Sequence, residues 1–268
     1  MMTTGKLLFL GTGGSMGIPV IACSCAVCRS LSVFNQRNRP SALISIDKQK
    51  LLIDCGPDFK LQALKYQLDQ IDGVIFTHAH NDHTVGIDDL KVYCLRTGRP
   101  LPCLLSPETA GELKARFNYL FEEREPYAGL MTRLAMQPLE RRRGEVVFQG
   151  LRIRYFSYEQ LHMRVDGYRF GDLAYVSDIK EYPQSIFEDL EGVRTLVLSA
   201  LRFQPSKMHF SLDEAVEFAQ KIGAENTWLM HIAHELDHDE GNAHLPENIR
   251  LAYDGLQLDF QADIISDL

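Results

Sequence analysis

Residues 77–83 read Thr-His-Ala-His-Asn-Asp-His and stand at the end of an apolar run that we predict as a buried strand over Gly73–Thr77. Three imidazoles and one carboxylate within six residues are the ligand types that divalent transition metals prefer. His78 and His80 have the alternate spacing of a strand end and can hold one ion, whereas Asp82 and His83 lie past the turn and can hold a second. Four solvated loop residues would be the alternative, but ligand-type residues seldom cluster this way. The segment therefore predicts a metal centre.

Further ligands should come from the ends of other buried strands. Asp178 follows the apolar run 173–177, and His231 follows 227–230. His162 comes after the predicted strand 151–156 and a short loop. Taken alone, Asp178 could be a turn or helix-capping residue, His231 a core histidine, and His162 an ordinary polar residue. They become candidates because a two-ion centre needs more ligands than one loop supplies.

A second metal motif lies near the N-terminus. Cys23, Cys25 and Cys28 form a CxCxxC pattern whose thiolates could hold zinc if a fourth ligand is added. His234, three residues after His231, could turn away from the first centre and complete a closed Cys3His site, which would be structural. Free buried thiols or a redox pair are the alternatives. The other three cysteines are scattered and are expected to be core residues: Cys55, Cys94 and Cys103.

Composition limits the class of protein. The 268 residues are 45% hydrophobic and carry 28 Lys plus Arg against 36 Asp plus Glu, a net charge of −8. This excludes a disordered chain or a disulfide miniprotein and argues against binding of long nucleic acid, though not of a small anion. No apolar run reaches the roughly 18–20 residues of a membrane span. We expect a soluble, cytoplasmic protein with a single domain over residues 1–268 and no membrane partner.

Periodicity indicates alternating strands and helices, with an αβ plan that is repeated in the second half. The glycine-rich residues 11–15 lack the Lys-Ser/Thr pair of a nucleotide loop and are interpreted as a tight turn. We expect a capping box at Ser211 and Glu214 and a last helix after Pro246. The predicted strands are 6–10, 42–46, 50–53, 73–77, 145–148, 151–156, 168–176, 195–199 and 227–230. The other predicted helices are 57–68, one opening at Ser106, and 212–222.

The HxHxDH of His78–His83, the Gly-Pro-Asp after Asp54 and the strand-end Asp178 and His231 resemble the metallo-β-lactamase superfamily across nearly the whole chain. The resemblance implies an α/β fold, the αββα four-layer sandwich of two pseudo-symmetric halves. It also implies one ion site from His78, His80 and His162, a second from Asp82, His83 and His231, and a bridging Asp178.

Together with CxCxxC and the late HxxH, these motifs look like the PhnP-type phosphodiesterases of that superfamily. The resemblance implies a metal-dependent hydrolase that cleaves a small, cyclic phosphodiester with hydroxide activated by two ions, zinc or manganese, beside one structural zinc. His209 matches a catalytic histidine of the group, and Asp82 is assigned a catalytic role as well as a ligand role. Partners beyond the small substrate are not implied, and a homodimer is left open.

Three rival functions remain within the superfamily, and one lies outside it. A nuclease that processes transfer-RNA 3′ ends shares the HxHxDH core, but we find no basic or glycine-rich insertion. A thioester or lactone hydrolase would keep both ions, and only CxCxxC and His209 argue against it. The pyrroloquinoline quinone biosynthesis protein B has the cysteine motif but altered active-site ligands. A non-catalytic metal-binding module would need no His209.

Arg39, Arg202 and Lys207 could contact a phosphate, although each is expected to be a solvated surface charge. His238 and His244 are also expected at the surface.

Overall fold

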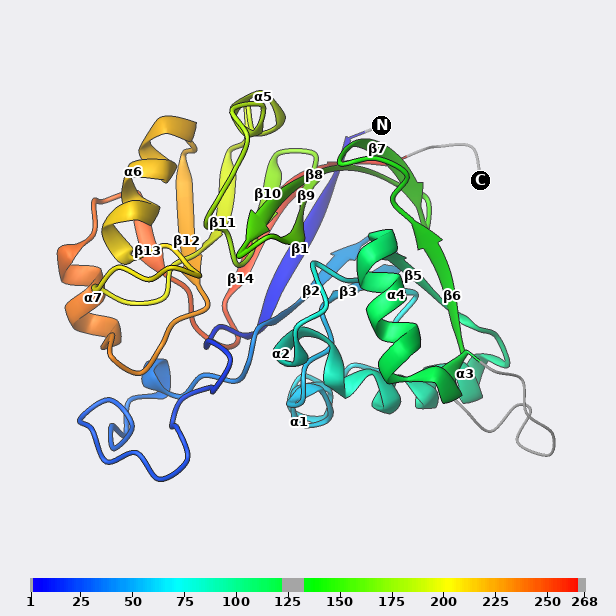
Figure 1. The fold of residues 1–268 in the computed structure, drawn as a ribbon, viewed down its shortest axis with the longest axis horizontal. Coiled ribbons are helices and arrows are strands. Elements are labelled where there is room, and N and C mark those ends of the chain that lie inside the picture. Colours follow the sequence, from blue (N-terminus) through cyan, green and yellow to red (C-terminus); the bar gives the residue numbers. More distant parts are fainter. Residues whose placement is uncertain (1, 122–132, 265–268) are drawn as a thin grey trace.

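A computed structural model describes residues 2–121 and 133–264. Two seven-stranded mixed sheets pack face to face, and helices cover the outer face of each (Figure 1). The predicted αββα sandwich of metallo-β-lactamase type is confirmed. Both chain ends of the described segment lie at the same side of the molecule, because the last strand returns to pair with the first.

The first sheet contains the N-terminal strands and the C-terminal one, in the order β14-β1-β2-β3-β4-β5-β6. Its strands are β1 Met2–Gly11, β2 Ser41–Ile46, β3 Gln49–Ile53, β4 Gly73–Ile75, β5 Leu101–Leu105, β6 Leu134–Pro138 and β14 Gln257–Asp263. The helices on its outer side are α1 Phe59–Lys65, α2 Asn81–Thr84, α3 Lys91–Thr97 and α4 Pro107–Arg116. Short 3-10 turns occur at Val33–Asn35, Val85–Leu90 and Asn118–Leu120.

The second sheet has the order β13-β12-β11-β10-β9-β8-β7. Its strands are β7 Arg143–Phe148, β8 Leu151–Gln160, β9 Met163–Phe170, β10 Leu173–Val176, β11 Thr195–Ser199, β12 Asn226–Met230 and β13 Ile249–Leu251. Helices α5 Ile186–Asp189, α6 Leu212–Ile222 and α7 His238–His244 lie on its outer side (Figure 1).

Three apolar clusters hold these four layers together. The central cluster fills the space between the sheets and draws on both, for example Phe9 and Ile44 from the first and Tyr168 and Val197 from the second. The other two lie between each sheet and its helices. Buried apolar area is the main source of folding free energy, and the central cluster joins the two halves. This agrees with one domain over residues 1–268, which stays a prediction.

Several local predictions are confirmed. Residues 47–48 join β2 to β3 in an antiparallel hairpin. Helix α6 begins and ends at the predicted residues, and at its start Ser211 accepts a hydrogen bond from the Glu214 amide while the Glu214 carboxylate accepts one from the Ser211 amide. Ser106 caps α4 as expected. These features depend on neighbouring residues alone, which is why sequence patterns find them.

Two predicted elements were wrong. The run 168–176 is not one strand, because Gly171, at φ 61°, begins a turn and the chain folds back so that Leu173 pairs with Phe170. The last helix does not follow Pro246; it precedes it as α7, capped by the Asp237 carboxylate, and the chain after Pro246 forms β13 and β14. Pairing with β12 and β1 overrides local preference there. No helix in the described ranges is long and apolar enough to cross a membrane.

Candidate metal centre

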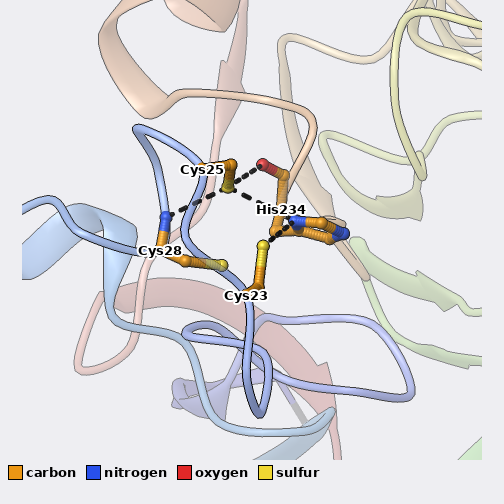
Figure 2. Close-up of side chains that lie close together, drawn as sticks. All are labelled: Cys23, Cys25, Cys28 and His234. Atoms are coloured by element: carbon orange, nitrogen blue, oxygen red, sulfur yellow. Dashed lines mark hydrogen bonds between the residues drawn. The ribbon is translucent and has the colours of Figure 1, made fainter.

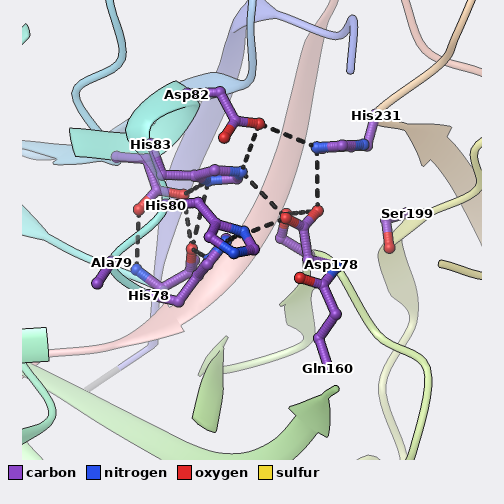
Figure 3. A network of polar contacts seen from close by, with 12 residues as sticks. His78, Ala79, His80, Asp82, His83, Gln160, Asp178, Ser199 and His231 are labelled. Atoms are coloured by element: carbon purple, nitrogen blue, oxygen red, sulfur yellow. Dashed lines mark hydrogen bonds and ion pairs between the residues drawn. The ribbon is translucent and has the colours of Figure 1, made fainter. Parts of the chain in front are cut away.

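Three loops at strand ends meet between the two sheets and carry most of the predicted ligands (Figure 3). The first loop follows β4 and continues into α2, and it brings His78, His80, Asp82 and His83. The second follows β10 and brings Asp178, and the third follows β12 directly and brings His231. Asp178 and His231 both have positive φ, 52° and 63°. Such backbone strain in non-glycine residues is concentrated at functional sites.

The ring of His83 is oriented by a buried carboxylate from the neighbouring strand. Asp54, at the end of β3, accepts hydrogen bonds from the Thr77 amide and hydroxyl, both 2.8 Å long, and from His83 Nδ1 at 2.7 Å. The Thr77 hydroxyl oxygen lies 2.9 Å from His78 Nδ1 and can accept a hydrogen bond from it. Both rings therefore direct Nε2 toward the centre, which is the usual arrangement of metal-binding histidines.

Asp178 is the middle of the cluster. Its Oδ2 lies 3.2 Å from His78 Nε2 and 3.1 Å from His83 Nε2, and its Oδ1 lies 3.2 Å from His231 Nε2. His231 Nε2 is also 3.4 Å from Asp82 Oδ2. The possible ligands thus form two groups that share Asp178. One is Asp82, His83, Asp178 and His231, and the other is His78, His80 and Asp178.

The chemistry of this donor set fits divalent ions. His83 Nε2 and Asp178 Oδ2 are fully buried, and neither makes a hydrogen bond within the described part of the chain. Buried polar atoms without partners are costly, and a metal ion between them would remove that cost. Both oxygens of the shared carboxylate lie within the cluster, Oδ2 beside His78 and His83 and Oδ1 beside His231. The two groups would hold two ions bridged by Asp178, as the sequence predicts.

Protonation of the cluster follows from burial and from neighbouring charge. Burial alone raises the pKa of Asp178, but His231 and His83 overcome it and hold the pKa well below the ordinary value. Burial likewise opposes protonation of His83, whereas Asp82 and Asp178 raise the pKa of His83 well above the usual range. Burial and the neighbouring His78 lower the pKa of His80 to about 4. Positive charge is therefore favoured at this point, and a divalent ion would replace the proton on His83.

His209 stands beside the cluster without belonging to it. Its Nδ1 is 3.8 Å from Asp178 Oδ1, and its ring stacks on His231 with centroids 4.7 Å apart. Burial lowers the pKa of His209 to about 4, so the ring is neutral at pH 7. The position of His209 next to both ion groups suits its predicted catalytic role, which stays a prediction. The predicted catalytic role of Asp82 stays a prediction as well.

The structure does not bring His162 to the other predicted ligands. Leu161 and His162 form the tip of the β8–β9 hairpin, with φ of 46° and 67°, and both are exposed. His162 and His80 do line the same cavity of about 790 Å³, beside α4. The predicted role of His162 as a ligand therefore has no support from the geometry of the described residues.

The cysteine motif and His234 meet as expected (Figure 2). The sulfur atoms of Cys23 and Cys25 each lie 3.4 Å from His234 Nδ1, and Cys28 completes the group. The Cys28 amide, and then His234, lower the pKa of the Cys25 thiol to about 6, which favours a thiolate. Burial raises the pKa of Cys28 to about 11. Four ligands with no open position are typical of a structural zinc site, which ties the N-terminal loop to the C-terminal half.

The remaining predicted residues lie outside the metal centre. Cys55, Cys94 and Cys103 are buried, as expected. Arg39 forms an ion pair with Asp58, and Arg202 forms one with Glu235 at 2.5 Å. Lys207 and His244 are exposed. His238 was predicted at the surface, but it is buried.

Burial of His238 has a simple cause. His238, at the start of α7, packs against the N-terminal loop. Its ring stacks on Phe34, and its Nδ1 lies 3.0 Å from Arg37 Nη2. The sequence analysis also missed the role of two residues, Asp54 and Thr77, which were quoted only as parts of motifs. Asp54 follows one predicted strand and Thr77 ends the next, and a carboxylate and a hydroxyl at neighbouring strand ends are the signal that could have found them.

Comparison with known proteins adds to this geometry. Residues 49–232 match the model of the beta-lactamase superfamily domain. The structure is similar to the crystal structure of a diphosphatase from the PhnP family, with a TM-score of 0.90 and 35% identity over 98% of this chain and 99% of that one.

Curated sequences give two more relatives. An octanoyltransferase of Porphyromonas gingivalis is 33% identical over 94% of this chain, and the chain spans about half, 51%, of its length. A ribonuclease Z of Clostridium kluyveri is 35% identical over 35% of this chain and 26% of its own length. In both cases this chain matches only a part of the relative, 51% of the first and 26% of the second.

Proposed function

Because this chain belongs to the PhnP family of the beta-lactamase superfamily and is a metal-dependent hydrolase, we propose that it hydrolyses a bond to phosphorus in a small substrate, with a cyclic phosphodiester as the first candidate. One observation carries the proposal. Asp178 joins two groups of metal ligands within one buried cluster, and His209 lies 3.8 Å from that carboxylate. A non-catalytic metal-binding module would need no such histidine.

The chemistry follows from the positions of the side chains. Two divalent ions bound at these groups would lower the pKa of a shared water molecule and neutralise charge on the phosphate oxygens. Asp54 and Thr77 hold His83 and His78 in place, so the site is organised before substrate binds. His209, as a neutral imidazole, can donate a hydrogen bond to the leaving oxygen. These roles suit in-line attack on phosphorus.

A diphosphate is the second candidate substrate. It is favoured by the similarity, over almost the full length of both chains, to a protein described as a diphosphatase. Cleavage of a diphosphate and of a phosphodiester both expel an oxygen from phosphorus, and the same two ions would serve either. The two substrates differ in the leaving group, which is a phosphate in the first case and an alcohol in the second.

A substrate panel separates these possibilities. Protein of measured metal content is incubated with nucleoside 2′,3′-cyclic phosphates, a ribosyl cyclic phosphate, bis(4-nitrophenyl) phosphate, a P1,P2-disubstituted diphosphate, an octanoyl thioester, a lactone and a transfer-RNA precursor. We expect turnover of a phosphorus substrate, with the highest kcat/KM for a cyclic diester. Higher kcat/KM for the diphosphate would favour the second candidate. Turnover of only the thioester or lactone, or no turnover, would contradict the proposal. Turnover of only the transfer-RNA precursor would contradict the small substrate and favour a nuclease.

A further inference from the structure

A cavity of about 280 Å³ lies beside His209, at the ends of β11 and β12. Three segments line it. They are residues 14–20, which include part of the glycine-rich turn, residues 201–209 after β11, and residues 232–235 after β12. Pockets that hold small molecules have volumes of roughly 300–1,000 Å³, so this cavity is large enough for one ring-sized group.

Backbone hydrogen bonds join the three walls of the cavity to one another. The Gly14 amide donates to the Ile232 carbonyl oxygen at 2.8 Å, and the Ala233 amide donates to the Leu201 carbonyl oxygen at 2.9 Å. His234 also lines the cavity, and it belongs to the cysteine group that holds the N-terminal loop. The cavity is therefore formed before a substrate binds.

The cavity adjoins the metal centre. His209 lines it, and the same ring stacks on His231 and lies 3.8 Å from Asp178. Gly14 lines it as well, and a Cβ at Gly14 would lie 3.4 Å from His231 Nδ1. A substrate whose phosphorus atom is bound between the ligand groups can therefore extend past His209 into this cavity.

The lining suits a neutral group that carries hydroxyls. Ser15 and Ser206 offer hydroxyls, and Ser206 Oγ accepts a hydrogen bond from the Met208 amide at 3.1 Å, which leaves its own proton to donate. Arg202 and Glu235 are charged, but they pair with each other at 2.5 Å. In the neighbouring cysteine group, three thiolates would exceed the charge of one divalent ion by about one unit. The described lining residues thus give a phosphate no excess positive charge.

We propose that this cavity, the leaving-group pocket, receives the group attached to the leaving oxygen and selects a neutral, hydroxyl-bearing ring such as a pentose. The inference rests on the proposed function. In hydrolysis the water oxygen bonds to phosphorus, the bond from phosphorus to the leaving oxygen breaks with its electron pair on that oxygen, and a proton of the water completes the alcohol. With the leaving oxygen at His209, the sugar of a cyclic diester lies in the leaving-group pocket. A diphosphate would place its second phosphate there.

Binding of a sugar alone tests the pocket without an assay of activity. Methyl riboside is titrated into metal-loaded protein, and binding is followed by saturation-transfer NMR and calorimetry. Ser15→Phe and Ser206→Phe each add an aromatic ring to a different wall of the pocket. Because the added ring occupies space that the sugar needs, we expect each variant to bind methyl riboside about 10-fold or more weakly than the unmodified chain.

Two control variants add the same ring elsewhere. Gln204→Phe places it on the same loop as Ser206, at an exposed position outside the lining. Gly111→Phe places it in the cavity of about 790 Å³ beside α4, where a Cβ would meet no atom within 4 Å. Both should bind methyl riboside as the unmodified chain does. Circular dichroism, Tm and metal analysis show whether each variant is folded and loaded. Ser15 and Ser206 lie on separate segments, so one variant suffices if the other does not fold.

Turnover gives a second measurement. Ser206→Phe should lower kcat/KM for a cyclic diester by more than it lowers kcat/KM for a diphosphate. An equal loss for the two substrates would overturn the selection of a neutral group. The pocket itself would be overturned if methyl riboside did not bind, if it bound the folded Ser15→Phe and Ser206→Phe variants with unchanged affinity, or if Gly111→Phe abolished its binding. A protein that binds methyl riboside in the expected pattern but cleaves no phosphorus substrate would uphold the pocket and contradict the proposed function.

Discussion

Asp178 and His209 illustrate how single residues combine in this site. Asp178 lies between both ion groups, with Oδ2 beside His78 and His83 and Oδ1 beside His231, and its backbone has a positive φ shortly after the end of β10. His209 is held from two sides, by the ring of His231 and the amide of Gln160. The carboxylate is thus placed to bind the metal ions, and the imidazole is placed to act on the substrate. Substitutions should separate these two roles.

His209→Ala should lower kcat and leave the metal content intact. Loss of a hydrogen-bond donor that stabilises the charge developing on a leaving oxygen costs roughly 10²- to 10³-fold in rate. Steady-state kinetics and metal analysis of the same preparation check this, with exposed His244→Ala as the control. Loss of an ion from His209→Ala would instead make His209 a ligand.

Asp54→Asn should weaken metal binding without removing any ligand. Asp54 accepts a hydrogen bond from His83 Nδ1 and another from the Thr77 hydroxyl, so an amide in its place would disturb both ligand rings. Partners of this kind typically contribute about 10- to 100-fold in metal affinity. Calorimetric titration with Zn²⁺ measures the effect. An affinity equal to that of the unmodified chain would show that Asp54 has no part in the centre.

Elements differ in how well the sequence predicts them. The HxHxDH segment is local, since one strand end and one helical turn carry all four ligands. Gly56 and Gly86 allow α2 to pack closely here, because a Cβ at Gly56 would lie 2.0 Å from the Asp82 carbonyl oxygen. Asp178, His231 and His234 come from distant segments. Their strand-end positions and spacing made them candidates, but the division of Asp178 and His231 between two ion sites came only from the family resemblance.

The β8–β9 hairpin is where the structure gives the sequence prediction no support. Gln160 pairs with Met163, so Leu161 and His162 form a two-residue turn whose tip is exposed to solvent. The ligand role of His162 came from the family resemblance and stays a prediction. The direction of its side chain depends on where the turn begins, and composition does not reveal that.

The N-terminal loop, residues 12–40, is the element most dependent on a metal ion. It has little regular structure and contacts the C-terminal half through Cys23, Cys25 and His234. Cys25→Ser should release one zinc and lower Tm by roughly 2–4 °C for each kcal/mol of stability lost. Metal analysis and a thermal melt check this, with exposed Ser24→Ala as the control. Full metal content and an unchanged Tm in Cys25→Ser would contradict a structural zinc.

At the scale of the whole molecule, the net charge of −8 has to be weighed against the bound ions. Two divalent ions between the sheets would place positive charge inside an acidic protein. An acidic surface disfavours a long polyanion, but a small phosphate compound needs only the centre. The sandwich brings strand ends from both sheets to one place, and that placement puts Asp178 of the second sheet between His231 of the same sheet and the ligands that follow β4 of the first.

The central claim is that two ions sharing Asp178 perform hydrolysis at phosphorus. Metal-free protein reconstituted in steps with Mn²⁺ or Zn²⁺, with bound ions counted at each step, tests it through the hydrolysis of the best phosphorus substrate in the panel. We predict full activity only when two ions are bound beyond the one held by the cysteines, and none in Asp178→Ala at any loading. Full activity with one such ion, or activity that persists in Asp178→Ala, would contradict the account.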